Sequence, residues 1–128
     1  MFRLSNLIKT TLEDTKSRTL NGSIMIWNFT NRCNLSCHHC YSKADANEKD
    51  TLTFQEIEQT ISRLKKGGVN FVIFSGGEPL LRKDIFDIAQ CMKDNGIMTY
   101  LSTNGLYISP KNVDKIIDTF NYIGISID

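Results

Sequence analysis

Short runs of apolar, aromatic and β-branched residues recur along this chain at similar intervals, with amphipathic segments between them. Runs that are apolar on both faces are typical of strands in a parallel sheet that is covered by helices. The pattern therefore predicts four strands, over residues 24–29, 70–74, 97–101 and 122–127.

The segments between these strands have helical periodicity and clear end signals. In the first segment, Thr53 and Glu56 have the spacing of a capping box, and Gly67 follows the last periodic position. In the second, Asp84 is the expected N-cap and Gly96 the expected stop. Two helices are therefore expected between the first three strands.

A third helix is expected to begin at Ser109-Pro110, because proline is tolerated at the first helical position, where its missing N–H costs nothing. Its apolar stripe is expected to comprise Val113, Ile116, Ile117 and Phe120.

The alternation of strands and helices predicts an α/β fold, a parallel sheet with right-handed crossovers. Such sheets place their sites at the carboxyl ends of the strands. Suggestive groups follow each strand: a cysteine array, then Gly76-Gly77-Glu78-Pro79, then Ser102-Thr103-Asn104-Gly105, then Ser126 and Asp128. All of these groups are expected on one rim of the sheet.

The cysteine array, CNLSCHHC, places Cys33, Cys37 and Cys40 in a C-x₃-C-x₂-C pattern. Four thiolates normally hold an iron–sulfur cluster, so three leave one iron open to a substrate or cofactor. Zinc sites more often show paired C-x₂-C knuckles, and four donors from so tight a loop are hard to arrange tetrahedrally. Disulfides need an oxidising compartment, and no secretory leader is expected. Cys91, in a predicted helix, is expected to be a partly buried small apolar residue.

Composition narrows the range of partners. The length of 128 residues suits one domain with its own hydrophobic core. A net charge of +1 gives no electrostatic reason to expect nucleic acid or an anionic membrane. No apolar run approaches the roughly 20 residues that span a bilayer. We therefore expect a cytoplasmic protein whose thiols stay reduced and available for a metal.

The four motifs together resemble those of the radical SAM superfamily: CNLSCHHC, SGGEP, STNG and SID, in this order. The resemblance covers residues 23–128, which we expect to be the N-terminal part of the core domain, preceded by an extension over 1–22. It implies a partial (β/α)₆ barrel of TIM-like type, here ending after the fourth strand. It also implies a [4Fe-4S] cluster on Cys33, Cys37 and Cys40, and S-adenosylmethionine on the open iron.

The chemistry that this resemblance implies begins with an electron from a low-potential donor such as ferredoxin or flavodoxin. Cleavage of the sulfonium then yields a 5′-deoxyadenosyl radical, which abstracts a hydrogen atom from the substrate. In such enzymes the cofactors supply the difficult chemistry and the protein supplies position and electronics.

The resemblance also assigns cofactor contacts, each with a plainer alternative. His39 would lie against the adenine, or be an ordinary loop histidine. Gly76 and Gly77 would let the backbone approach the methionyl amino group, or form a plain strand-to-helix turn. Glu78 would bind that ammonium, or stabilise the following helix start through its charge.

Four further residues are expected at the cofactor on the same basis: Ser102 and Asn104 at the third strand, and Ser126 and Asp128 near the ribose hydroxyls. Asn104-Gly105 is also a common turn pair, and Tyr41 is expected to pack rather than to do chemistry.

A narrower resemblance is to radical SAM proteins of haem d1 biosynthesis, carried by IMIWNFTNRCNLSCHHCYSKAD and FSGGEPLLRKDIFDIA. It implies side-chain modification of a tetrapyrrole. A peptide-modifying radical SAM enzyme and a non-catalytic metal-binding fragment are the alternatives. Because such enzymes continue through further barrel units, we expect the 128 residues alone to be inactive.

Overall fold

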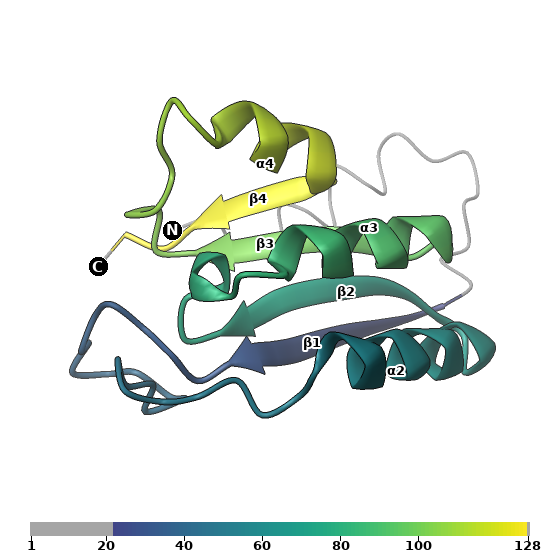
Figure 1. The fold of residues 1–128 in the computed structure, drawn as a ribbon, viewed down its shortest axis with the longest axis horizontal. Coiled ribbons are helices and arrows are strands. Elements are labelled where there is room, and N and C mark those ends of the chain that lie inside the picture. The colour runs from purple at the N-terminus through teal and green to yellow at the C-terminus, as the bar shows by residue number, and fades with distance from the viewer. Residues whose placement is uncertain (1–21, 128) are drawn as a thin grey trace.

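The computed structural model describes residues 22–127, and within them the predicted parallel sheet is present. Its strand order is β1-β2-β3-β4, with every neighbouring pair parallel (Figure 1). The strands are β1 (Ser23–Thr30), β2 (Val69–Gly76), β3 (Met98–Thr103) and β4 (Tyr122–Ile125). The four predicted strands are thus confirmed, with shifted ends. The largest shift that matters here is at β3, which includes Ser102 and Thr103.

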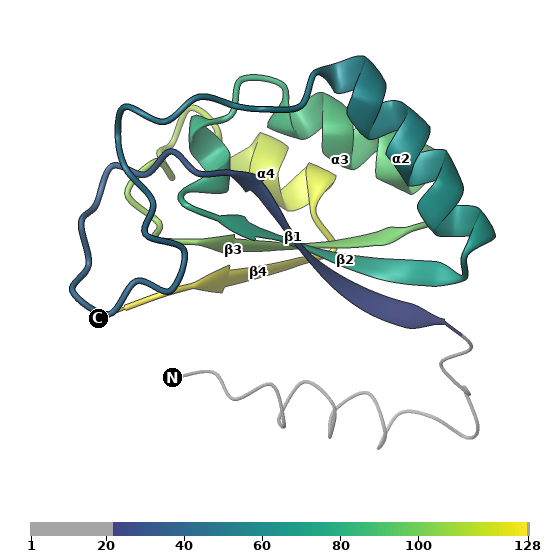
Figure 2. The same cartoon turned by 90° about the horizontal axis from the view of Figure 1, so that it is seen from below.

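Three α-helices cover one face of this sheet in the described part of the chain, as Figure 2 shows. They are α2 (Phe54–Lys66), α3 (Ile85–Asp94) and α4 (Val113–Thr119), and a short 3₁₀ helix, η1 (Pro79–Leu81), precedes α3. The alternation of strand and helix follows the α/β prediction. The expected extension over residues 1–22 lies, except for its last residue, outside the described residues.

The two predicted helix N-termini differ in how well the structure matches them. The capping box is present, since Thr53 Oγ1 accepts from Glu56 N at 3.3 Å and Glu56 Oε2 accepts from Thr53 N at 2.8 Å. The bond from Thr53 N, and a second one that the Thr53 hydroxyl donates to Glu56 Oε2 at 2.8 Å, lower the pKa of Glu56. Asp84 occupies the N-cap of α3 but makes no capping bond, because its carboxylate accepts instead from Arg82.

The third helix begins later than expected. Residues 109–112 form a turn in which Ser109 O accepts from Asn112 N and Val113 N, and α4 itself starts at Val113. The expected apolar stripe is only partly right. Ile116 is buried, whereas Ile117 is 59% exposed, because it lies about 100° further around the helix and faces away from the sheet.

The hydrophobic core lies between the sheet and the helices. Phe74 of β2 is fully buried at its centre, stacked on Phe29 with ring centroids 4.3 Å apart and edge-on to Phe120 at 5.3 Å. The opposite face of the sheet carries exposed apolar side chains, with Ile24 and Ile26 both more than half exposed. Among the described residues, no helix is both long and apolar enough to cross a membrane.

One buried arginine joins the irregular segment 31–53 to the helical layer. Arg82 is 3% exposed, and its guanidinium donates to Phe29 O at 3.0 Å, to Leu52 O at 2.8 Å and to both carboxylate oxygens of Asp84. Buried charges are stable only when they are paired and hydrogen-bonded, and this one is. The arginine therefore links the end of β1, from which the cysteine segment starts, to Leu52 near the end of that segment.

Candidate functional site

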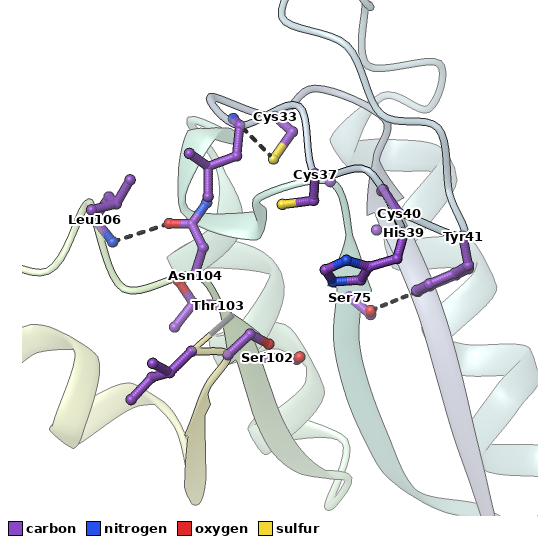
Figure 3. A pocket seen from close by; sticks show the side chains of 15 residues that line it. Cys33, Cys37, His39, Cys40, Tyr41, Ser75, Ser102, Thr103, Asn104 and Leu106 are labelled. Carbon is purple, nitrogen blue, oxygen red and sulfur yellow. Dashed lines mark hydrogen bonds between the residues drawn. The ribbon is translucent and has the colours of Figure 1, made fainter. Parts of the chain in front are cut away.

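The carboxyl ends of the four strands meet at one rim, as the topology predicts, and a hollow of about 600 Å³ lies there. This volume is in the range of small-molecule sites, roughly 300–1,000 Å³. Figure 3 shows its walls, formed by the cysteine segment and by the ends of β2 and β3. Nine of the predicted site residues line it: Cys33, Cys37, His39, Cys40, Gly76, Gly77, Ser102, Asn104 and Ser126.

Of the other two predicted site residues, Asp128 lies outside the described residues. Glu78 lies beneath the floor, fully buried, where its carboxylate accepts from Thr103 Oγ1 and from Asn104 N, both at 2.8 Å, and from Leu80 N at 3.0 Å. In this arrangement Glu78 joins the end of β2 to the end of β3 and also caps η1.

The cysteine segment has no regular secondary structure but is held by backbone hydrogen bonds. Cys33 N donates to Asp45 O at 3.3 Å, and Asp45 N donates to Asn31 O at 3.0 Å, which closes the segment into a loop. Within it, Cys40 N donates to Cys37 O at 3.1 Å. The three cysteines are thus carried by a loop with a defined backbone path.

The three thiols are free and partly exposed. Cys33 Sγ accepts from Leu35 N at 3.5 Å. The Ser42 hydroxyl, 3.2 Å from Cys40 Sγ, lowers the pKa of Cys40 to about 7, with help from backbone N–H groups at Ala44 and Ser42. A lowered pKa favours the thiolate, the form that binds metal.

The donor set fits a cluster of several irons. Within residues 22–127, no group of three His, Cys, Asp or Glu side chains is close enough to hold a single metal ion. In a four-iron cluster each thiolate binds a different iron, so the thiols need only face a common space. Cys33, Cys37 and Cys40 do face one, and the side chains of Cys37 and His39 project over the strand ends that carry Ser75 and Ser102 (Figure 3).

The glycine pair is required by this chain's own backbone. Gly76 has a φ of +121°, which L side chains rarely adopt, and a methyl group there would overlap Thr30 O. A methyl group on Gly77 would overlap the carbonyl of Arg32, the residue directly before Cys33. The backbones are also hydrogen-bonded here, since Gly77 N donates to Thr30 O at 2.8 Å. The absence of side chains at this pair therefore lets the start of the cysteine segment lie against β2.

A model of the radical SAM superfamily matches residues 27–128. The chain belongs to the radical SAM superfamily. The match covers the end of β1, the cysteine segment, the glycine pair and both later strand ends, so it includes the walls of the hollow.

Curated relatives of this radical SAM chain include three proteins named for haem chemistry. It is 38% identical over all of its length to the pre-heme d1 synthase of Dinoroseobacter shibae, covering 33% of that protein. It is 36% identical to the Fe-coproporphyrin III synthase of Methanosarcina barkeri, over 82% of this chain and 27% of that protein. An AdoMet-dependent heme synthase of the same organism is also 36% identical, over 73% of this chain and 27% of that protein. The chain spans about a third or less of these relatives.

Two solved structures show the same fold. SuiB of Streptococcus suis, bound to precursor peptide SuiA, has a TM-score of 0.71 at 21% identity, covering 97% of this chain and 28% of that one. The structure of anSMEcpe with bound AdoMet has a TM-score of 0.66 at 21% identity, and the match covers 84% of this chain and 32% of that one. These neighbours support the prediction of a TIM-like partial barrel.

Several residues at and beside the hollow were not anticipated from the sequence. Tyr41, expected to pack, is 72% exposed; its hydroxyl lies 3.0 Å from Ser75 Oγ and donates to Asn28 Oδ1 at 3.3 Å. Ser75 directly precedes the glycine pair, a position that could have drawn attention to it. Asn34, next to Cys33, accepts a hydrogen bond from Asn104 Nδ2 at 2.8 Å through its side-chain oxygen.

Proposed function

We propose that this chain is the cofactor-binding part of a radical SAM enzyme, with a [4Fe-4S] cluster on Cys33, Cys37 and Cys40 and S-adenosylmethionine in the adjoining hollow. The observation that carries the proposal is the common hollow that these three thiols share with the ends of β2, β3 and β4. Cys33, Cys37 and Cys40 would hold the cluster, which would supply the electron for reductive cleavage of S-adenosylmethionine and so give access to radical hydrogen abstraction from a substrate. An external low-potential donor, of the ferredoxin or flavodoxin class, would provide the electron.

The residues around the hollow would bind and orient the cofactor. The turn at Gly76 and Gly77 presents backbone rather than side chain to the methionyl end. His39, whose side chain projects over the strand ends (Figure 3), would lie against the adenine. Ser102 and Ser126 also line the hollow; Ser102 would contact the cofactor, and Ser126 would reach the ribose hydroxyls. Asp128, two residues after Ser126, belongs to the same proposal.

Glu78 takes a different role in this proposal from the expected ammonium contact. Its carboxylate is fully buried and already accepts three hydrogen bonds from this chain. It therefore acts through the rim residues that it holds. Reducing conditions, as in the cytoplasm, would keep the three thiols free for the cluster.

For the whole protein we propose a tetrapyrrole substrate, modified at its side chains in haem or haem d1 formation. The support is the identity of 36–38% to three proteins whose names place them in that chemistry. The alternative is a peptide substrate. It is supported by 30% identity over 86% of this chain to the mycofactocin maturase MftC of Mycolicibacterium smegmatis.

The test of the cofactor proposal is anaerobic reconstitution of the natural full-length protein. We expect about four irons and four sulfides per chain, and 5′-deoxyadenosine after reduction with S-adenosylmethionine present. Cys33→Ala, Cys37→Ala and Cys40→Ala should each abolish both. A protein that binds one zinc and forms no 5′-deoxyadenosine would instead support the non-catalytic metal-binding alternative.

The substrate proposal has its own test. Sirohaem-derived and coproporphyrin-type tetrapyrroles should each be offered to the reconstituted protein beside unrelated peptides. We expect a tetrapyrrole to raise 5′-deoxyadenosine formation above the uncoupled rate and to change in mass. Coupled turnover with a peptide alone would overturn the tetrapyrrole assignment and leave the cofactor chemistry intact.

A further inference from the structure

The side-chain amide of Asn104, on the rim of the hollow, is engaged at both ends. Its Oδ1 accepts from Leu106 N at 3.0 Å (Figure 3), and its Nδ2 donates to Asn34 Oδ1 at 2.8 Å. Because the Leu106 backbone N–H can only donate, the amide oxygen must face it. The amide nitrogen is then directed at Asn34, on the other side of the hollow.

The backbone of Asn104 is fixed from below. Its N–H donates at 2.8 Å to Oε2 of Glu78, whose other oxygen accepts from Thr103 Oγ1 at 2.8 Å. Hydrogen bonds to an ionised carboxylate are shorter and stronger than neutral ones, and this carboxylate is fully buried. Thr103 Oγ1 in turn accepts from Gly105 N at 3.0 Å, so the whole turn after β3 is held.

The far end of the bridge is part of the cysteine segment. Asn34 directly follows Cys33, and the next residue, Leu35, donates its N–H to Cys33 Sγ at 3.5 Å. The orientation of the peptide group between Asn34 and Leu35 therefore decides whether that N–H reaches the sulfur. Hydrogen bonds to the sulfur ligands are among the features that set the reduction potential of an iron–sulfur cluster.

We propose that the hydrogen-bonded chain Glu78–Asn104–Asn34 is a strut that sets the position of the cysteine segment. Asn104 is then a positioning residue for the Cys33 thiolate and not a contact to S-adenosylmethionine. The inference rests on the proposed function for its cluster. The geometry of the strut belongs to the protein alone, so it also predicts behaviour of the metal-free chain.

The first experiment uses the reconstituted natural full-length protein without S-adenosylmethionine. Asn34→Ala, Asn104→Ala and the double variant are compared by the EPR spectrum of the reduced cluster and by its midpoint potential. Each single variant should change the spectrum and lower the potential, because loss of an N–H···S bond disfavours the more negative reduced state. The double variant should shift no further than either single one, since both remove the same bond.

The second experiment measures amide hydrogen exchange in the metal-free protein. Loss of one hydrogen bond at this exposed site should speed exchange over residues 33–40 roughly two- to five-fold in both alanine variants. Asn34→Asp keeps the acceptor for Asn104 Nδ2 and should retain wild-type exchange. The control is Asn121→Ala. It removes a bond in which Thr99 N donates at 2.9 Å to Asn121 Oδ1 near the amino end of β3, and it should leave residues 33–40 unchanged.

The outcomes separate this inference from the proposed function. Failure of the wild-type protein to form a cluster would refute the proposed function, while unchanged exchange over 33–40 in Asn34→Ala would refute the strut. If Asn104→Ala alone weakened binding of S-adenosylmethionine and the cofactor-free EPR spectrum stayed the same, Asn104 would be a cofactor contact. That result would also overturn the inference.

Discussion

Replacement of the buried carboxylate by an amide, Glu78→Gln, tests the anchoring of the site floor directly. The carboxylate accepts from Leu80 N and Thr103 Oγ1 through one oxygen and from Asn104 N through the other. Glutamine has the same shape but only one acceptor oxygen. Whichever way its amide is turned, its NH₂ group faces a backbone N–H, of either Leu80 or Asn104.

The magnitude follows from these contacts. A buried backbone donor left without a partner costs about 1–3 kcal/mol, and relief of the desolvation cost of a buried charge offsets part of that penalty. We therefore expect a local destabilisation of about 2 kcal/mol at the turn after β3. Since each 1.4 kcal/mol corresponds to a factor of ten, the local opening equilibrium should rise about 30-fold.

The assay is amide hydrogen exchange, followed by mass spectrometry, of a peptide covering residues 102–106 in the natural full-length protein. The matched control is Glu58→Gln, which makes the same change in charge on the exposed side of α2. Exchange should accelerate in Glu78→Gln alone. Unchanged exchange in Glu78→Gln, or equal acceleration in the control, would show that the carboxylate does not hold this turn.

Three further changes test other parts of the structure. Arg82→Met should lower the free energy of unfolding by about 3 kcal/mol in urea denaturation, because two backbone carbonyls lose a buried donor; Lys83→Met, exposed, should change it little. Gly77→Ala should reduce cluster content measured as iron per chain, because its methyl group displaces the Arg32 carbonyl next to the array; wild-type content would refute this contact. Cys91→Ala should retain full cluster content, and loss of iron would show that the ligands are wrongly assigned.

The behaviour expected of Cys91 follows from its surroundings in α3. It is partly buried, and desolvation, with smaller contributions from Glu58 and Asp94, raises the pKa of its thiol. A raised pKa disfavours the thiolate that iron binding requires. Cys40 is in the opposite situation, because the Ser42 hydroxyl lowers the pKa of its thiol.

Local features of the sequence were sufficient for the architecture and for most of the site. Strand runs and helix caps depend on neighbours a few residues apart, which is why the capping box at Thr53 and Glu56 and the order of elements were predictable. The parallel order then requires all carboxyl strand ends to meet at one rim. The meeting of Cys33 with Ser102 and Ser126 at one hollow follows from that rule.

Tertiary structure alone decided how the groups at the rim are paired. Asn34 and Asn104 are 70 positions apart, and no periodicity relates a residue of an irregular loop to one on another strand end. The burial of Glu78 likewise depends on the packing of η1 against β3, which the residues adjacent to Glu78 in the sequence do not reveal. The steric demand at Gly77 arises from the path of the Arg32 carbonyl. Sequence determined which groups reach the rim; the packing of the segments around it determined which of them face the hollow and which hold the others in place.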